Sequence, residues 1–155
     1  MHDLTPYRAV APYDWAAILR LIRTEFAGMD GRINPPSSMH TLTQAALAAA
    51  AHVGEVWVIG RPPLACVVLT PKPQALYVGK LAVDRAHRGQ GLARRLIGAA
   101  EARARALGLA ALELQVRIEL VENHAAFRAM GFIKTTETAH PGFDRPTSLT
   151  FVKAL

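Results

Sequence analysis

Hydrophobic and polar positions in the first half of the chain predict one short strand, two helices and an antiparallel meander of three strands. The first helix begins at Pro12, ends near Gly28, and has one apolar face made by Trp15, Ile18, Leu19, Ile22 and Phe26. Residues 28–42, which include two consecutive prolines, predict a loop. The other elements expected here are a strand at residues 7–10, a helix at about 43–51 and strands at 55–59, 64–69 and 76–83.

In the second half, strands and helices alternate. An amphipathic helix is expected from residue 91 to about 107, ended by Gly108, with a core face made by Leu92, Leu96, Ala99, Ala100, Ala104 and Leu107. A strand follows at 109–116, along which Leu112, Leu114 and Val116 alternate with polar residues. A strand, a helix and a further strand in succession predict a parallel pair with a right-handed crossover. The remaining elements expected are a helix at about 121–130 and paired strands at 132–138 and 147–152.

The composition is typical of a single globular domain, here residues 1–155. Hydrophobic residues make up 51% of the chain and charged residues 19%, which excludes a disordered protein, and no apolar run is long enough to span a membrane. Residues 1–6 lack the charged-then-apolar pattern of a signal peptide, and Cys66 has no second cysteine for a disulfide. We therefore expect a cytoplasmic protein with no membrane partner, in which Cys66 is a buried structural thiol.

Residues 79–98 carry the strongest chemical signal, because an apolar strand runs through a basic, glycine-rich turn directly into a helix. The N–H groups in the first turn of a helix have no intrahelical partner, and the helix dipole adds positive potential there. Gly89 and Gly91 allow the backbone to curl closely around an anion. Further charge and bidentate donors come from Arg85, Arg88, Arg94 and Arg95. The stretch therefore predicts a site for a phosphorylated ligand.

Two common phosphate loops do not fit this stretch. No Lys-Ser or Lys-Thr pair follows the glycines, as a Walker loop requires, and Arg94 stands where the dinucleotide fingerprint has Gly or Ala. The residues do match Arg-x-x-Gly-x-Ala, at Arg88, Gly91 and Ala93, after the strand Leu81-Ala82-Val83. This combination resembles the acetyl-coenzyme A signature of the GCN5-related N-acetyltransferases, the GNAT family. The order of predicted elements is similar to that family along essentially the whole chain.

The resemblance implies a mixed α/β fold, with a central mixed sheet of about six to seven strands flanked by four helices. It implies an enzyme that uses acetyl-CoA as co-substrate, without a metal, and transfers the acetyl group to a primary amine by direct attack in a ternary complex. In such a fold the two central parallel strands splay apart, and the pantetheine arm lies between them along the main chain of Leu81 and Val83. A main-chain N–H near residues 81–83 would stabilise the oxyanion, and the turn from Arg88 to Ala93 would bind the pyrophosphate. The coenzyme-binding residues implied are Leu81, Ala82, Val83, Arg88, Gly89, Gln90, Gly91, Leu92, Ala93, Arg94, Asn123 and Phe127.

The sequence departs from the family in its last helix. The usual ending there is Asn-x-x-Ala-x-x-x-Tyr-x-x-x-Gly-Phe, with the tyrosine protonating the coenzyme sulfur. Counting back from Gly131, the tyrosine position holds Phe127, the asparagine position Leu120 and the alanine position Asn123. Phenylalanine has no proton to donate, so the common general acid is absent. Asn123 could reach the coenzyme from one turn away, or could cap the helix instead.

Four residues are candidates for the base that deprotonates the amine. Tyr77 lies on the strand before the phosphate loop, near where some family members keep a catalytic glutamate. Glu119, Glu122 and His124 cluster after the second parallel strand, where an acceptor could enter. A solvated charge or a charge at a helix start explains each carboxylate better than a catalytic role does. His140 and Asp144 could line the same entrance from the last loop, and no metal-ligand spacing is present.

The sequence leaves two other functions and the acceptor open. The net charge of +6 suggests nucleic-acid binding, but the basic residues gather between Lys80 and Arg105, where the coenzyme phosphates account for them, so a nucleic-acid partner is not expected. A non-catalytic module that binds acyl-CoA keeps the fold and is favoured slightly by the missing tyrosine. The acceptor would be a small-molecule or peptide amine bound between residues 28–42 and 139–146. A homodimer is possible by resemblance alone.

Overall fold

A computed structural model describes residues 3–155, so Met1 and His2 of the segment inspected for a signal peptide lie outside the described residues. These residues form a seven-stranded sheet in the order β1-β2-β3-β4-β5-β7-β6. The strands are β1 Tyr7–Ala9, β2 Glu55–Ile59, β3 Ala65–Pro71, β4 Leu76–Val83, β5 Ala111–Arg117, β6 Ile133–Thr138 and β7 Ser148–Ala154. β4 and β5 are parallel and the other neighbours are antiparallel. The meander, the parallel pair and the mixed sheet are thus confirmed.

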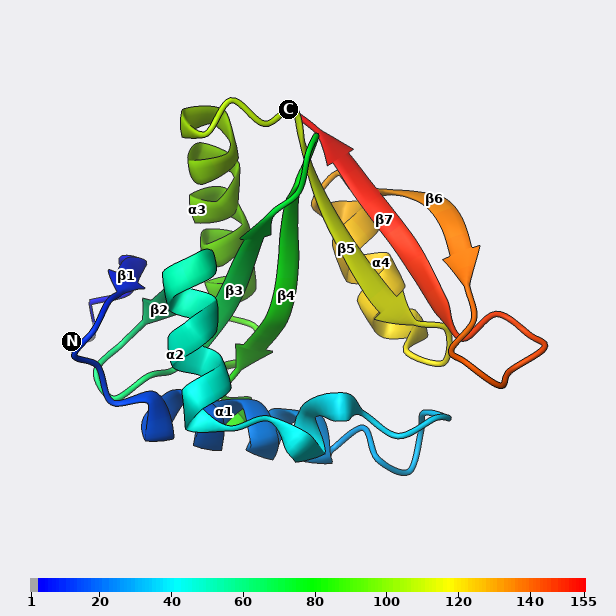
Figure 1. Cartoon of the computed structure of the whole chain (residues 1–155), viewed down its shortest axis with the longest axis horizontal. Coiled ribbons are helices and arrows are strands. Elements are labelled where there is room, and N and C mark those ends of the chain that lie inside the picture. Colours follow the sequence, from blue (N-terminus) through cyan, green and yellow to red (C-terminus); the bar gives the residue numbers. More distant parts are fainter. Residues whose placement is uncertain (1–2) are drawn as a thin grey trace.

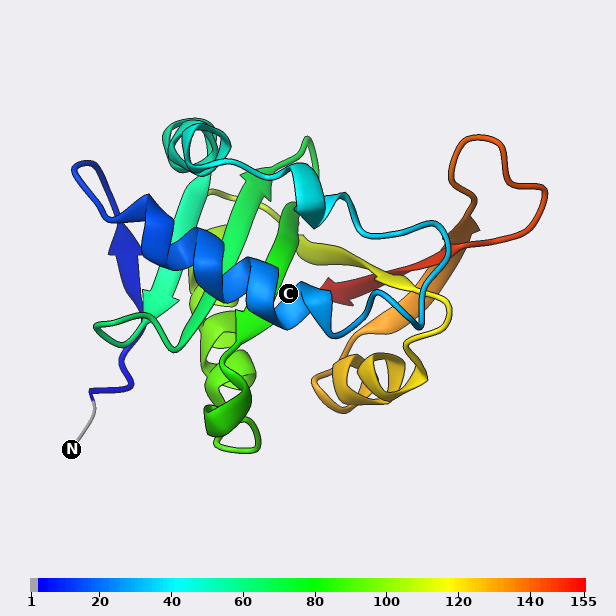
Figure 2. The same ribbon diagram turned by 90° about the horizontal axis from the view of Figure 1, so that it is seen from below.

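Four helices cover the two faces of this sheet. They are α1 Trp15–Ala27, α2 Gln44–Val53, α3 Leu92–Ala106 and α4 Val121–Ala129, with short 3₁₀ turns at η1 Ser38–Thr41 and η2 Arg85–His87. Figure 2 shows α1 and α2 on one face and α3 and α4 on the other. The first helix begins three residues later than Pro12, because the Asp14 carboxylate caps the N–H of Ala17. None of the helices within residues 3–155 is long and apolar enough to cross a membrane.

Each face of the sheet buries its own hydrophobic cluster. Under α1 and α2 the fully buried residues include Ile18, Ile22, Leu47, Val56 and Val58. Under α3 and α4 they include Leu96, Ala100, Leu112, Phe132 and Phe151. This packing against both faces is what places the strand ends and the loops that follow them.

The expected core face of α3 is wrong at one end. Leu107 is 43% exposed, and Ile97 is buried instead. The buried set, Leu92, Leu96, Ile97, Ala100 and Ala104, follows the helical period around one line. Leu107 lies one residue past the last helical residue, at the C-cap, where the chain already turns away from the sheet.

β4 and β5 start side by side and then separate. Their parallel register covers Leu76↔Leu112 and Tyr77↔Glu113, after which the strands diverge toward their C-terminal ends (Figure 1). A bulge in β4 accompanies the divergence: its register with β3 shifts between Cys66↔Ala82 and Val68↔Gly79. Within the bulge Lys80 has a φ of +51°, a left-handed conformation that non-glycine residues seldom adopt. The edge of β4 that faces β5 is therefore opened from Val78 onward.

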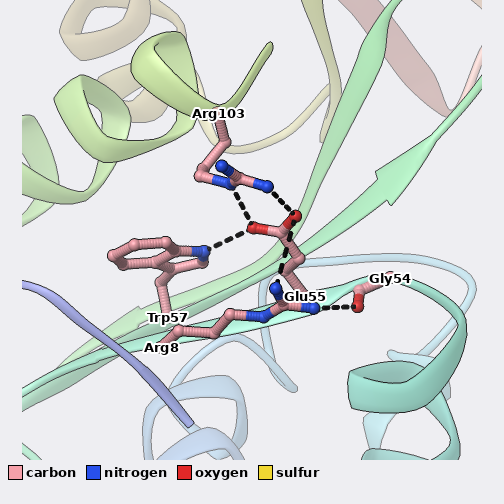
Figure 3. A network of polar contacts seen from close by, with 5 residues as sticks. All are labelled: Arg8, Gly54, Glu55, Trp57 and Arg103. Carbon is pink, nitrogen blue, oxygen red and sulfur yellow. Dashed lines mark hydrogen bonds and ion pairs between the residues drawn. The ribbon is translucent and has the colours of Figure 1, made fainter. Parts of the chain in front are cut away.

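A buried carboxylate ties α3 to β2 on the side of the sheet away from this opening. Glu55 is 5% exposed, and both its oxygens accept bonds from Arg103, at 2.8 Å from Nε and 2.9 Å from Nη2 (Figure 3). The indole Nε1 of Trp57 donates to the same carboxylate at 2.9 Å, and Arg8 lies 4.0 Å away. Because every acceptor oxygen is bonded, the charge can be buried, and it fixes the last turns of α3.

Candidate active site

A cleft of about 780 Å³ occupies the opening between β4 and β5. One wall is β4 from Tyr77 to Val83, and the other is β5 from Leu114 to Arg117. Residues 88, 89 and 91–93 close one end, and α4 contributes Asn123 and Phe127. The residues that the sequence placed at a coenzyme site thus share one continuous cavity, except for two. Gln90 and Arg94 are exposed beside it, outside its lining.

The glycine-rich turn has the backbone that an anion site needs. Gly89 and Gly91 have φ values of +78° and +79°, and a Cβ built on either meets no atom within 4 Å. The glycines are therefore required by backbone conformation and not by crowding. Gly91 is the N-cap of α3, and within residues 3–155 no side-chain hydrogen bond caps this helix start. Those donors, beginning at Leu92, remain available beside the cleft.

Arg88 of this turn is paired with a buried carboxylate that the sequence did not indicate. Its Nη2 bonds to Oε2 of Glu25, which is 6% exposed near the end of α1, and both residues line the cleft. The guanidinium of Arg85 lies near Gly28. The end of α1 thus holds the basic turn from the opposite side.

The bulged segment of β4 offers its main chain to the cleft. Leu81, Ala82 and Val83 all line it, while Ala82 and Val83 pair with Cys66 and Ala65 of β3 on the other side. Because β5 has diverged at this level, main-chain groups on the β5 edge of β4 are open to a ligand. Cys66 itself is fully buried, and burial raises the pKa of its thiol to about 12, so it is the inert structural thiol expected.

Two candidates for the base line the cleft but are poorly suited to accept a proton near neutral pH. Burial, and to a lesser extent the charge of Glu113, raise the pKa of Tyr77, so its hydroxyl stays protonated near neutral pH. Glu122 forms a bidentate pair with Arg32, with Nη2 2.8 Å from Oε2. Hydrogen bonding to that guanidinium lowers the pKa of Glu122 to about 2. A carboxylate held in this way accepts protons poorly at neutral pH.

The other two candidates lie outside the cleft lining. Glu119 accepts the N–H of Asn34 at 3.1 Å through Oε2, while its buried Oε1 has no hydrogen-bond partner in residues 3–155. His124 is 6% exposed, with Nε2 2.9 Å from the carbonyl oxygen of Arg117 and its ring 5.8 Å from that of Phe151. Both side chains thus have contacts that hold the loop and α4 against β5.

The loop after α1 is fastened across the far end of the cleft. Arg117 donates to the carbonyl oxygens of Pro35 and Pro36, at 2.6 and 3.1 Å. Together with the Arg32–Glu122 pair, this joins residues 28–42 to the end of β5 and the start of α4, and Figure 1 shows the loop passing below the opening. Ser37, Ser38 and His140 line this end, whereas Asp144 is exposed and outside the lining.

On α4 the ring of Phe127 packs edge-on against Phe132, 5.7 Å between centroids, and lines the cleft without offering a proton. Among the described residues there is no group of three or more His, Cys, Asp or Glu side chains that could hold a metal ion.

Sequence reasoning missed Glu25, Arg32, Lys80 and Arg117, whose roles depend on partners far along the chain or on a backbone bulge.

Comparison with known proteins agrees with this geometry. The family model described as Acetyltransferase (GNAT) family matches residues 15–132, while no curated protein has significant sequence similarity to the chain. The chain is similar in structure to an acetyltransferase from Streptococcus agalactiae 2603, at 16% identity over 97% of this chain and 99% of that one, with a TM-score of 0.73. A GNAT family acetyltransferase from Elizabethkingia anophelis with acetyl-CoA bound is 14% identical over 97% of both chains, with a TM-score of 0.71. The ribosomal-protein-S18-alanine N-acetyltransferase from Escherichia coli is 18% identical over 96% of this chain and 93% of that one, with a TM-score of 0.67.

The family match covers most of the chain, and the solved structures share its fold along nearly its whole length. The structure of this chain has the glycine-rich turn, two parallel strands that diverge, and a cleft between those strands. The chain belongs to the GNAT family of acetyltransferases.

Proposed function

We propose that the protein transfers an acetyl group from acetyl-CoA to a primary amine by direct attack in a ternary complex. The observation that carries this proposal is the continuity of the cleft. It runs from an uncapped helix N-terminus with two left-handed glycines, along the opened edge of β4, to an end lined by Arg32, Ser37 and Ser38 of residues 28–42. A long phosphorylated thioester and a separate acceptor need a site of this form.

The residues present fit the coenzyme. First-turn N–H groups of α3 and the guanidinium of Arg88 would hold the pyrophosphate. The opened edge of β4 at Leu81–Val83 would pair with the amides of the pantetheine arm, as a neighbouring strand would. A main-chain N–H of that segment, held rigidly by the bulge, would stabilise the oxyanion that forms on the thioester carbonyl.

The acceptor would enter at the opposite end, where Arg32, Ser37, Arg117 and Glu122 line the cleft. Both a small molecule and a peptide N-terminus are compatible with this lining, and the similar structure from Escherichia coli is named for an acceptor in a ribosomal protein. We infer the acceptor class only as a primary amine.

The test is thermal unfolding with acetyl-CoA, compared between the wild type and Arg88→Gln. At about a hundredfold excess over its dissociation constant a ligand stabilises the folded state by about 2.7 kcal/mol. For a chain of this size that raises the unfolding midpoint by about 5–11 °C. Arg88→Gln should lose most of the shift, and Arg105→Gln, an exposed change at the far end of α3, should keep it. The absence of a shift in the wild type would contradict the proposal.

One observation favours a second function. Phe127 stands where the family usually has the tyrosine that donates a proton to the coenzyme sulfur. A protein that binds acyl-CoA without turning it over would not need that donor. Release of CoA thiol with any primary amine would exclude this alternative.

A further inference from the structure

The titratable groups at the acceptor end of the cleft leave one candidate for a base. Arg32 and Arg117 are protonated at all relevant pH values. Glu122 is held ionised by Arg32, and Tyr77 is held protonated by burial. Apart from Lys80 in the bulge of β4, His140 is the remaining titratable side chain at this end in the described part of the chain.

His140 reaches this position from the loop between β6 and β7. Its backbone N–H donates to Oγ1 of Thr147 at 2.9 Å, and the backbone N–H of Thr147 donates to the carbonyl oxygen of Thr138 at 2.8 Å. Thr147 is completely buried. The base of the loop is thus fixed by a buried residue, so the imidazole has a defined place in the cleft wall.

The contacts of Thr147 bear on which ring nitrogen of His140 carries the proton. Oγ1 of Thr147 lies 3.4 Å from the carbonyl oxygen of Thr138 and 2.5 Å from Nδ1 of His140. When the hydroxyl proton is assigned to the carbonyl oxygen of Thr138, Oγ1 is an acceptor toward Nδ1. In that assignment Nδ1 holds the hydrogen, and Nε2 of the neutral imidazole keeps a free lone pair.

We propose that His140 is the group that accepts the proton from the attacking amine, and that Thr147 is the positioning residue that leaves its Nε2 unprotonated. This inference rests on the proposed acetyl transfer. It assigns the base to a residue outside the four that sequence reasoning favoured.

The charges around His140 agree with this role. Burial and the guanidinium of Arg117, from the end of β5, lower the pKa of His140, and the carboxylate of Glu119 acts in the opposite direction. The net effect keeps the imidazole neutral at pH 7, so it can take up a proton.

The reaction then balances as follows. Nε2 of His140 takes one proton from the ammonium, and the freed nitrogen lone pair forms a C–N bond with the thioester carbonyl carbon. When the carbonyl re-forms, the C–S bond breaks and its electron pair leaves with sulfur. The second proton lost by the nitrogen ends on that thiolate through solvent, since Phe127 has none to give. His140 returns its proton to water. A primary amine with a pKa of about 10.4 needs such a first step at neutral pH.

The kinetic test uses the full chain with acetyl-CoA and the best acceptor from a panel of N-terminally free peptides, polyamines and aminoglycosides. His140→Gln should lower kcat about 100-fold, with the KM for acetyl-CoA unchanged. The wild-type rate should fall as the pH drops through the His140 pKa, below about 6.5, and that acid limb should disappear in the variant. His52→Gln, an exposed histidine in the last turn of α2, is the matched control and should behave as wild type.

Thr147 provides the test of positioning. Thr147→Val removes the hydroxyl at nearly constant volume and should lower kcat about tenfold or more, while Thr147→Ser should restore it. Each variant is first checked for the thermal shift with acetyl-CoA. A retained shift with wild-type kcat in His140→Gln would overturn this inference and leave the proposed acetyl transfer standing. A wild type that shows neither shift nor thiol release would instead contradict the proposed function.

A second measurement does not depend on turnover. Nitrogen-detected NMR of the imidazole of His140, assigned by comparison with His140→Gln, should show the Nδ1–H tautomer at pH 7.5 and a pKa below 6.5. An Nε2–H tautomer, or a ring still protonated at pH 7.5, would overturn the inference whatever acceptor is found.

Discussion

Arg88 of the glycine-rich turn and Glu25 of α1 form an ion pair at the end of the cleft where we propose that the coenzyme binds, 63 residues apart in the chain. The carboxylate is 6% exposed, whereas the guanidinium side chain is 54% exposed. The carboxylate is therefore held in place, and the guanidinium is the member that a ligand can draw away. A pyrophosphate that binds Arg88 must compete with Glu25 for it, and also approaches a negative charge.

We therefore expect Glu25→Gln to bind acetyl-CoA more tightly than the wild type. The change frees Arg88 and removes the repulsion, and a charge-assisted hydrogen bond is worth about 1.5–3 kcal/mol, so an increase of about fivefold or more is reasonable. Isothermal titration at low salt measures it. Glu101→Gln, the same change of charge on α3 with a partner in Lys153, is the control. Weaker binding by Glu25→Gln would show that the carboxylate orients Arg88 for the coenzyme instead.

Two glycines around α3 should respond in opposite ways to alanine. Gly91 has a φ of +79°, so Gly91→Ala should lower the free energy of unfolding by about 1–2 kcal/mol although there is space for the methyl group. Gly98 lies inside α3 with no atom within 4 Å of an added Cβ, so Gly98→Ala should raise the free energy of unfolding by about 0.5–1 kcal/mol. Urea unfolding curves compare the two. Equal changes in the free energy of unfolding for the two variants would mean that the turn at Gly91 adopts another backbone conformation.

The fold and the coenzyme turn could be predicted because their signals are local. The order of apolar runs, the turn glycines and the switch from strand to helix at Gly91 each depend on neighbouring residues. The family match and the observed sheet confirm the family and the fold that these signals indicated, while the binding of coenzyme at the turn stays a prediction. The prediction was wrong where the apolar pattern continues past the end of the element. Leu107 keeps the apolar spacing of α3 but lies one residue beyond its last helical residue.

The remainder of the site depends on tertiary contacts. Nothing near Glu25 or Glu122 in the sequence indicates that each is paired with an arginine from another element. These pairings change the proton affinity of the carboxylates. Glu122 is a candidate base by its position in the sequence, but its hydrogen bonds with Arg32 lower its pKa. The bulge at Lys80 was also missed, although Gly79 inside a strand pattern is a signal that could have indicated it.

That bulge gives a prediction about backbone strain. Lys80 has a φ of +51°, a region that β-branched residues avoid and asparagine tolerates. Lys80→Val should lower the free energy of unfolding by about 1–2 kcal/mol, whereas Lys80→Asn should leave it unchanged or slightly raised. Both variants remove the same charge, so the difference between them in urea unfolding isolates the backbone. The same stability in both would mean that the bulge is not rigid.

Glu55 should make stability depend on acid pH. Burial alone would raise its pKa, but the bonds from Arg103 and Trp57 and the charge of Arg8 outweigh this and leave the pKa below the usual 4.5. Its contribution is therefore present above about pH 4.5 and is lost as the pH falls through the lowered pKa of the folded state.

At pH 7 we expect Glu55→Gln to lower the free energy of unfolding by about 1–3 kcal/mol, because Arg103 loses its bidentate partner. The gap in the free energy of unfolding between variant and wild type, measured with urea, should narrow below pH 4.5. Glu137→Gln, on the exposed edge strand β6, should show little change at any pH. A gap that stays constant with pH would mean that packing, and not charge, is what Glu55 supplies.

Phe127 tests whether the missing hydroxyl limits the rate. Its ring lines the cleft and is held edge-on by Phe132, so Phe127→Tyr adds only an oxygen to a placed ring. A coenzyme thiol has a pKa of about 8.5, so its thiolate leaves readily. A proton donor at position 127 should therefore raise kcat by less than about tenfold. The KM for acetyl-CoA should stay the same, and thiol release with a fixed amine measures both. Phe143→Tyr, in the loop outside the cleft lining, is the control. An increase of a hundredfold or more would mean that expulsion of the thiolate, and not deprotonation of the amine, is the slow step in this protein.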